Sequence, residues 1–167
     1  MPSQELALTF EPDVPVVGQI LILEAVDFLY SLGVIGALGW SPDVEPGTDV
    51  AQFVVTVPGK LLPTQYTLRV RSAYSSQVTE VVGGVDKGLE LLWKLLDRIK
   101  QLRGVGVAGE KLRVVREELL PVIEKLRQLG ASDERIKELV QRALLYADQV
   151  LTELMAQHKL KLTRKPN

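Results

Sequence analysis

The segment from Val16 to Leu38 constrains the fold more than any other, because it is apolar at all but a few positions. On a helix, Glu24, Asp27 and Ser31 stand at i, i+3 and i+7, and so they form one narrow polar stripe. A helix that is apolar around the rest of its circumference must be buried on most sides or must face another subunit. We therefore expect a buried core or interface helix here.

A membrane span is the competing interpretation of this segment. Two carboxylates near its middle would each cost about 2.5–3.5 kcal/mol at the centre of a bilayer. The spacing of Gly33, Gly36 and Gly39 predicts that the helix ends near Leu32, which would leave it too short to span. The two carboxylates can form the solvent-facing stripe of a buried helix or a salt link to a basic helix of the second half.

Three shorter segments alternate apolar and polar residues in the period of two that is typical of strands with one buried face. They are residues 4–10, 51–57 and 65–73. A Pro/Gly connection over 58–64 joins the second and third segments, and this predicts an antiparallel hairpin. One face of that hairpin should be wet, because its outward row is Thr67, Arg69 and Arg71.

The remainder of the sequence predicts helices. One is expected over 87–103, and two more, over 112–129 and 133–154, carry apolar residues at heptad spacing. Pro121 should bend or interrupt the first heptad helix, and Ser132 should cap the second. Two such helices joined by about two residues, beginning with Gly130, must run antiparallel.

These patterns predict an α+β fold, in which a small antiparallel sheet in the order β-α-β-β-α precedes a C-terminal antiparallel helical hairpin with a coiled-coil seam. We expect an α+β domain over 1–103, a glycine-rich connector over 104–109, the hairpin over 110–157 and a basic, frayed tail over 158–167.

Residue counts exclude most catalytic chemistry. The chain of 167 residues has no Cys and one His, so it cannot build a zinc site from thiolates and imidazoles or use a cysteine nucleophile. His158 stands near the expected end of the last helix, where it is poorly placed for a catalytic triad. We therefore predict that the protein is not an enzyme and has no cofactor. An enzyme of unknown type stays an alternative, and it would rest on Glu24, Asp27, Tyr30 and Lys87.

Two glycine-containing segments resemble phosphate-binding loops only superficially. Residues 104–109 match G-x-G-x-x-G, but a helical segment precedes them where a dinucleotide fold requires a strand. The sequence Pro58-Gly59-Lys60 lacks the rest of a phosphate-loop motif. We interpret the first as a connector between helices and the second as a turn.

The charges are divided unequally along the chain, although the net charge is only −1. Residues 1–59 carry eight acidic side chains and no Lys or Arg, whereas all 20 basic side chains lie from Lys60 onward. Because Lys60 falls within the predicted hairpin, the division favours attraction within the chain or between subunits. The near-neutral total and the lack of aromatic residues in the tail argue against nucleic-acid binding.

The predicted sheet is too small to cover the apolar faces of these helices, and surplus apolar surface is usually covered by another chain. The sequence therefore predicts a cytoplasmic interaction or oligomerisation module, a scaffold or adaptor, whose partner is a second copy or another protein. A peripheral membrane-surface module using 16–38 or the basic tail is the alternative. The expected packing residues, some of them at the interface, are Leu119, Val122, Leu126, Val140, Ala147, Leu151 and Leu154.

Overall fold

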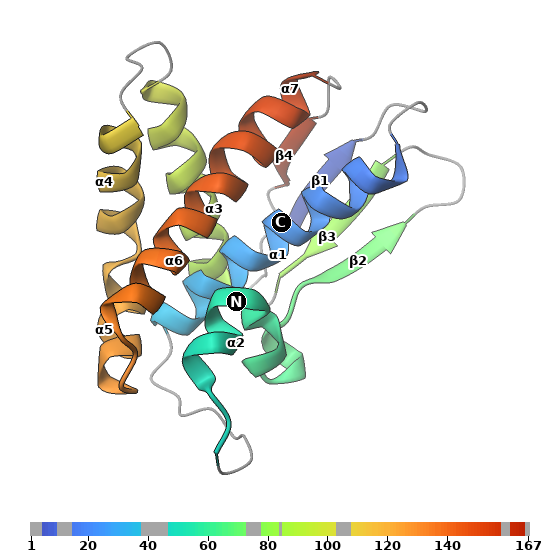
Figure 1. Cartoon of the computed structure of the whole chain (residues 1–167). Helices are drawn as coiled ribbons and strands as arrows, with labels where there is room; N and C mark the ends of the chain where they lie inside the picture. Colours follow the sequence, from blue (N-terminus) through green and yellow to red (C-terminus); the bar gives the residue numbers. More distant parts are fainter. Residues whose placement is uncertain are drawn as a thin grey trace.

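The computed structural model has an α+β fold, with a four-stranded antiparallel sheet and helices packed against it (Figure 1). It describes residues 5–9, 15–37, 47–72, 78–83, 85–102, 108–157 and 161–165. The strands are β1 (Glu5–Thr9), β2 (Arg69–Ser72), β3 (Val78–Val82) and β4 (Lys161–Lys165). The longer helices are α1 (Val16–Ala37), α3 (Asp86–Gln101), α4 (Ala108–Glu118), α5 (Leu120–Gln128) and α6 (Asp133–Leu144). The shorter helical segments are α2 (Val50–Thr56), η1 (Pro58–Leu61), η2 (Thr64–Tyr66), the π-helical η3 (Leu145–Leu154) and α7 (Met155–Gln157).

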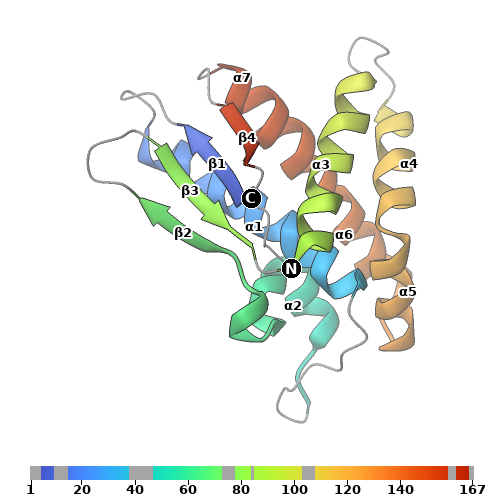
Figure 2. The same ribbon diagram turned by 180° about the vertical axis from the view of Figure 1, so that it is seen from behind.

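The sheet has the strand order β2-β3-β1-β4, so β1 lies in its interior and β2 and β4 form its edges. Leu6 and Leu8 of β1 are buried. Both belong to the hydrophobic core. Helix α1 lies against one face of the sheet, and no described helix covers the opposite face (Figure 2). The strand predicted over residues 4–10 is confirmed for residues 5–9, although Ala7 between the two leucines is buried as well.

The register places oppositely charged residue types next to one another across neighbouring strands. Glu5 of β1 stands opposite Lys165 of β4, and Arg71 of β2 stands opposite Glu80 of β3. The acidic beginning of the chain and its basic end thus lie on neighbouring strands of one sheet.

The strand predicted over 51–57 is wrong, because this segment forms α2. The Asp49 carboxylate accepts a hydrogen bond from the Gln52 backbone N–H at 3.1 Å and so caps the helix. Ala51, Val54 and Val55 are buried, and their spacing of i, i+3 and i+4 is that of a helical face rather than of a strand. The predicted hairpin between 51–57 and 65–73 is therefore absent, and β2 pairs with β3 instead.

The prediction of a frayed basic tail is also wrong for the tail residues that the structure describes. Residues 161–165 form β4, which pairs along its whole length with β1. The alternation of Lys161, Leu162 and Thr163 fits an edge strand, and basic residues are common on such edges because they prevent strand pairing between molecules. His158 lies outside the described residues.

Helix α1 continues to Ala37, so the predicted end near Leu32 is wrong. Gly33 lies against Gly88 of α3, and Gly36 lies against Val122 of α5, so close packing offsets the weak helix propensity of glycine. By length and composition alone α1 could cross a membrane, but 56% of its most apolar window is buried inside the protein.

The C-terminal helices begin and end near the predicted signals. A one-residue interruption at Leu119 separates α4 from α5, next to Pro121, which lacks a backbone N–H. Gly130 has a φ of 89° after α5, and the Ser132 hydroxyl accepts a hydrogen bond from the Arg135 N–H at 3.3 Å at the start of α6. The expected connector over 104–109 lies partly outside the described residues, and its last two residues begin α4.

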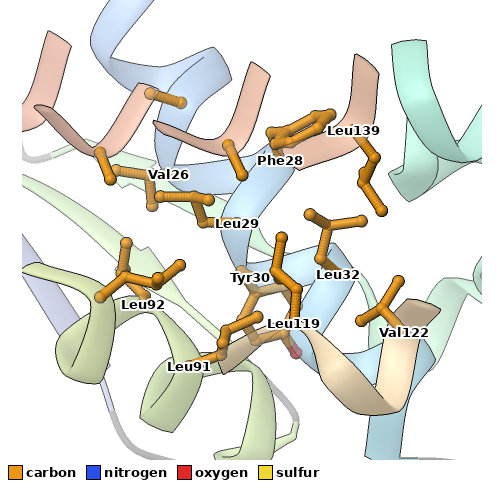
Figure 3. Packing of buried hydrophobic residues seen from close by; sticks show 14 of the residues in the cluster. Val26, Phe28, Leu29, Tyr30, Leu32, Leu91, Leu92, Leu119, Val122 and Leu139 are labelled. Atoms are coloured by element: carbon orange, nitrogen blue, oxygen red, sulfur yellow. The ribbon is translucent and has the colours of Figure 1, made fainter. Parts of the chain in front are cut away.

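Helix α1 occupies the centre of the molecule, where it contacts α3, α5, η1 and η3. Figure 3 shows Val26, Leu29 and Leu32 of α1 enclosed by buried side chains from the surrounding helices. The C-terminal end of α1 is held by α5, because the Lys125 ammonium donates a hydrogen bond to the Ile35 carbonyl at 2.9 Å.

Candidate functional site

The predicted interface residues lie inside the single chain. Six of them are buried in its core, and the seventh, Leu154, is partly buried and packed against it. The six are Leu119, Val122, Leu126, Val140, Ala147 and Leu151. These side chains act as packing residues, so a contact with a partner must use a different surface.

The four residues that an enzyme would have used are not brought together. Glu24 and Asp27 share one cleft, whereas Lys87 lines a different cavity near α5 and pairs with Glu90 at 3.1 Å. Tyr30 is fully buried. Its hydroxyl donates a hydrogen bond to the Tyr66 carbonyl at 2.8 Å and accepts one from the Val85 N–H at 3.1 Å, so it links α1 to η2 and to the residue before α3.

The cleft around Asp27 combines charged and apolar walls. Its volume is about 330 Å³, at the lower end of the range for small-molecule sites. Helix α1, the segment 56–58 and the junction of α6 with η3 contribute its walls. The lining residues are Glu24, Asp27, Phe28, Thr56, Val57, Pro58, Arg142 and Tyr146.

Burial raises the pKa of Asp27 above its ordinary value of 3.8, because the ionised carboxylate loses contact with water. The backbone at Gly59 is part of this cover. A Cβ atom at that position would stand 3.0 Å from an Asp27 carboxylate oxygen and 3.2 Å from the Ser31 hydroxyl. The Ser31 hydroxyl is buried without a hydrogen-bond partner in the described part of the chain.

Charged groups of both signs stand in this cleft without being paired. Among the described residues, Glu24, Asp27 and Arg142 take part in no hydrogen bond or ion pair. Among the described residues, the salt link that the sequence left as an alternative for these carboxylates is not made, although Arg142 of α6 lines the same cleft. Another residue of α6, Arg135, forms an ion pair with Asp49 at 3.5 Å.

Sequence reasoning missed the part of the cleft that the C-terminal helices supply. Arg142 and Tyr146 lie where α6 passes into η3, and the heptad pattern gave no sign of a π-helix there. The Thr152 hydroxyl donates to the Ala147 carbonyl at 2.7 Å, five residues earlier, in keeping with the wider turn. The Tyr146 ring meets Phe28 edge to face at 5.0 Å between centroids, which fixes its place in the wall.

A second surface feature lies at the start of α1, and we call it the α1 apolar face. It consists of Val16, Val17, Ile20 and Leu21, which are 71%, 66%, 49% and 38% exposed. The spacing i, i+1, i+4 and i+5 puts them on one side of the first two turns. Glu24 and Asp27 continue this side of α1 toward the cleft.

Within the described ranges, no three ligating side chains gather into a group that could hold a metal ion. No protein-family model matches the sequence, and neither a curated protein nor a solved structure is significantly similar to the chain.

Proposed function

We propose that this protein is a non-enzymatic protein–protein interaction module that self-associates through the α1 apolar face. One observation carries the proposal. Of the nine large apolar side chains exposed in the described parts of the chain, four lie together on this face. The other five lie elsewhere along the chain, and they are Val57, Val70, Leu120, Leu129 and Leu145. Scattered apolar residues are normal on a surface, whereas a contiguous group often marks an interaction site.

Charge complementarity favours a second copy of the chain as the occupant. If two copies of α1 pack antiparallel across a two-fold axis, Glu24 of one copy lies beside the first turn of the other. That turn contains no acidic residue, and a helix N-terminus carries about half a positive charge. The contact would thus supply each N-terminus with a carboxylate from its partner.

The edges of the sheet are less suitable for self-association. Edge strand β2 carries Arg69 and edge strand β4 carries Lys161, both of them exposed. Strand pairing between two copies would bring these like charges together, which destabilises a sheet contact. Helix contact through α1 has no such penalty.

The helical hairpin predicted over 110–157 has a supporting role in this proposal. Its side chains fill the core on which α1 rests, so the α1 apolar face is held in a rigid position. Rigid presentation lowers the entropic cost of association.

A membrane surface fits this face less well. Residues 1–59 contain no Lys or Arg, and the nearest charges, Glu24 and Asp27, are acidic, so anionic lipid would repel this end of α1. Residues 161–165 of the basic tail are held in the sheet. The charge distribution therefore supports protein rather than lipid as the partner.

The size of the face sets the strength of the expected contact. Exposed apolar patches of about 300–600 Å² are usual on monomers, and this face falls near the lower end. A symmetric pair would bury roughly 1,000 Å² or less, below the range of stable dimers. We therefore expect a weak dimer that is populated at high micromolar concentration.

Sedimentation velocity from about 10 µM to 1 mM tests the proposal, a range that brackets weak association. The sedimentation coefficient should rise with concentration for the wild type, and Ile20→Lys should abolish the rise. The matched control is Leu120→Lys, because Leu120 on α5 is 48% exposed. A monomer throughout this range, or equal loss of association in both variants, would contradict self-association through α1.

A further inference from the structure

The cleft between α1, the segment 56–58 and the start of η3 is separate from the α1 apolar face. Asp27 and Arg142 belong to the cleft alone, and Glu24 borders both features. The three side chains are two carboxylic acids and a guanidinium, and none is paired within the described residues. Charged side chains at a partly enclosed site are normally paired, so unpaired groups of both signs indicate that something else provides their partners.

Packed elements set the backbone positions of these groups. Asp27 stands on the central helix, where Gly59 approaches it closely. Arg142 stands on α6 four residues before Tyr146, whose ring packs edge to face against Phe28. Groups held by rigid elements bind a ligand with little loss of conformational entropy.

We propose that this cleft binds a small zwitterion, a molecule in which a short apolar skeleton joins one ammonium group to one carboxylate, as in a free amino acid. The ammonium group would lie against Asp27 and Glu24, and the carboxylate would meet the Arg142 guanidinium in a charge-assisted contact. The skeleton would contact Phe28, Val57 and Tyr146.

Ligands with a single charge match the cleft less well. A simple amine would leave the Arg142 guanidinium unpaired in a site that excludes part of the solvent, and a simple carboxylate would meet two carboxylates of like sign. A divalent cation would face Arg142 and would have only two carboxylate side chains as ligands. Only a ligand that carries both charges satisfies all three side chains.

Titrations monitored by ¹H–¹⁵N correlation spectra of the full-length protein test this proposal. Two skeletons are used, and each is compared with its singly charged analogues. L-leucine is compared with isoamylamine and 4-methylpentanoate, and 6-aminohexanoate is compared with pentylamine and hexanoate. At least one zwitterion should shift the amide signals around Asp27 and Arg142 and should bind about tenfold more tightly than either of its analogues.

The variants Asp27→Asn and Arg142→Gln should each weaken the binding of that zwitterion by about tenfold or more. Asp27→Asn removes the partner of the ammonium group, and Arg142→Gln removes the partner of the carboxylate. Their matched controls are Asp97→Asn on α3 and Arg127→Gln on α5, both at exposed positions. Controls that bind normally, with both cleft variants impaired, would support the proposal.

The proposal is overturned if no zwitterion binds at concentrations up to about 10 mM, or if an amine binds as tightly as its zwitterion. It is also overturned if the control variants weaken binding as much as the cleft variants do. The proposed self-association does not affect these outcomes, because Ile20→Lys leaves every lining residue unchanged and serves as a monomeric background.

Discussion

Replacing Gly33 by Ala tests the packing of the central helix. Gly33 of α1 meets α3 at Gly88, and a Cβ added to Gly33 would stand 2.7 Å from the Gly88 Cα and 2.9 Å from the Lys87 carbonyl oxygen. Both atoms belong to the backbone, so no side-chain rotation can relieve the contact. The two helices would have to move apart.

The expected cost follows from two opposing effects. Ala has a higher helix propensity than Gly, by about 1 kcal/mol in a helix interior, which would stabilise the variant. Overpacking a core costs about 1–3 kcal/mol or more, and backbone contacts fall at the upper end because they displace a whole helix. We expect a net loss of about 2 kcal/mol, equivalent to a decrease in Tm of about 4–8 °C for a chain of this size.

Urea denaturation and thermal melting measure this difference. The matched control is Gly109→Ala near the start of α4, because a Cβ at Gly109 would have no atom within 4 Å. That variant should gain about 0.5–1 kcal/mol. If Gly33→Ala stabilises the protein as much as Gly109→Ala does, α1 and α3 do not cross closely at Gly33 and Gly88.

Three other predictions concern charges and the last strand. Because the folded pKa of Asp27 is raised by burial, ionisation of this group disfavours the folded state above its ordinary pKa of 3.8. Asp27→Asn should therefore be more stable than the wild type at pH 7 in urea denaturation, with a difference that vanishes as the pH falls below that value; an equal difference at all pH values would contradict the stated cause. The Lys111 ammonium lies 3.0 Å from the buried Asp148 carboxylate, so Lys111→Met should lose about 1–3 kcal/mol of unfolding free energy, and Lys111→Met/Asp148→Asn should lose less. A larger loss in the double variant would show that the pair does not act as a unit. Deleting residues 161–167 should destabilise the protein by at least about 1–2 kcal/mol, because the packing of Leu162 against the core is lost, and should speed amide hydrogen exchange in β1. Unchanged stability would indicate that the tail is frayed.

The sequence predicted the structure most accurately at positions where one local signal decides it. Ser132 after Gly130 marked a helix boundary, and Pro121 marked an interruption, because capping and the missing N–H act within a few residues. The burial of the segment around Val26 and Leu29 also followed from its composition, since a helix apolar on most sides must be covered.

Predictions failed where tertiary contacts override local patterns. Phe53, Val55 and Val57 alternate as in a strand, but the segment forms a helix that Asp49 caps. Gly33 and Gly36 indicated a helix end in isolation, whereas in the fold they permit the close approach of two other helices. Pairing of residues 161–165 with β1 connects opposite ends of the chain, and short basic segments carry no signal for so distant a partner.

The candidate cleft was predicted only in part. The sequence identified Glu24 and Asp27 as a carboxylate pair on one helix face. Arg142 and Tyr146 were not associated with them, because their position depends on how α6 and η3 pack on α1. Likewise, heptad spacing identified residues such as Leu119 and Val140 as packing residues but could not show that their partners belong to the same chain.

Disulfide trapping tests self-association through α1 most directly, because the chain has no natural Cys. In the proposed antiparallel contact, Ile20 lies near the two-fold axis, where the Cα atoms of the two copies would approach the roughly 7 Å limit for a disulfide. At high micromolar concentration under mild oxidation, Ile20→Cys should form covalent dimers faster than Leu120→Cys, whose site is as exposed as that of Ile20. Equal rates for the two variants would show that the α1 apolar face is not where two copies meet.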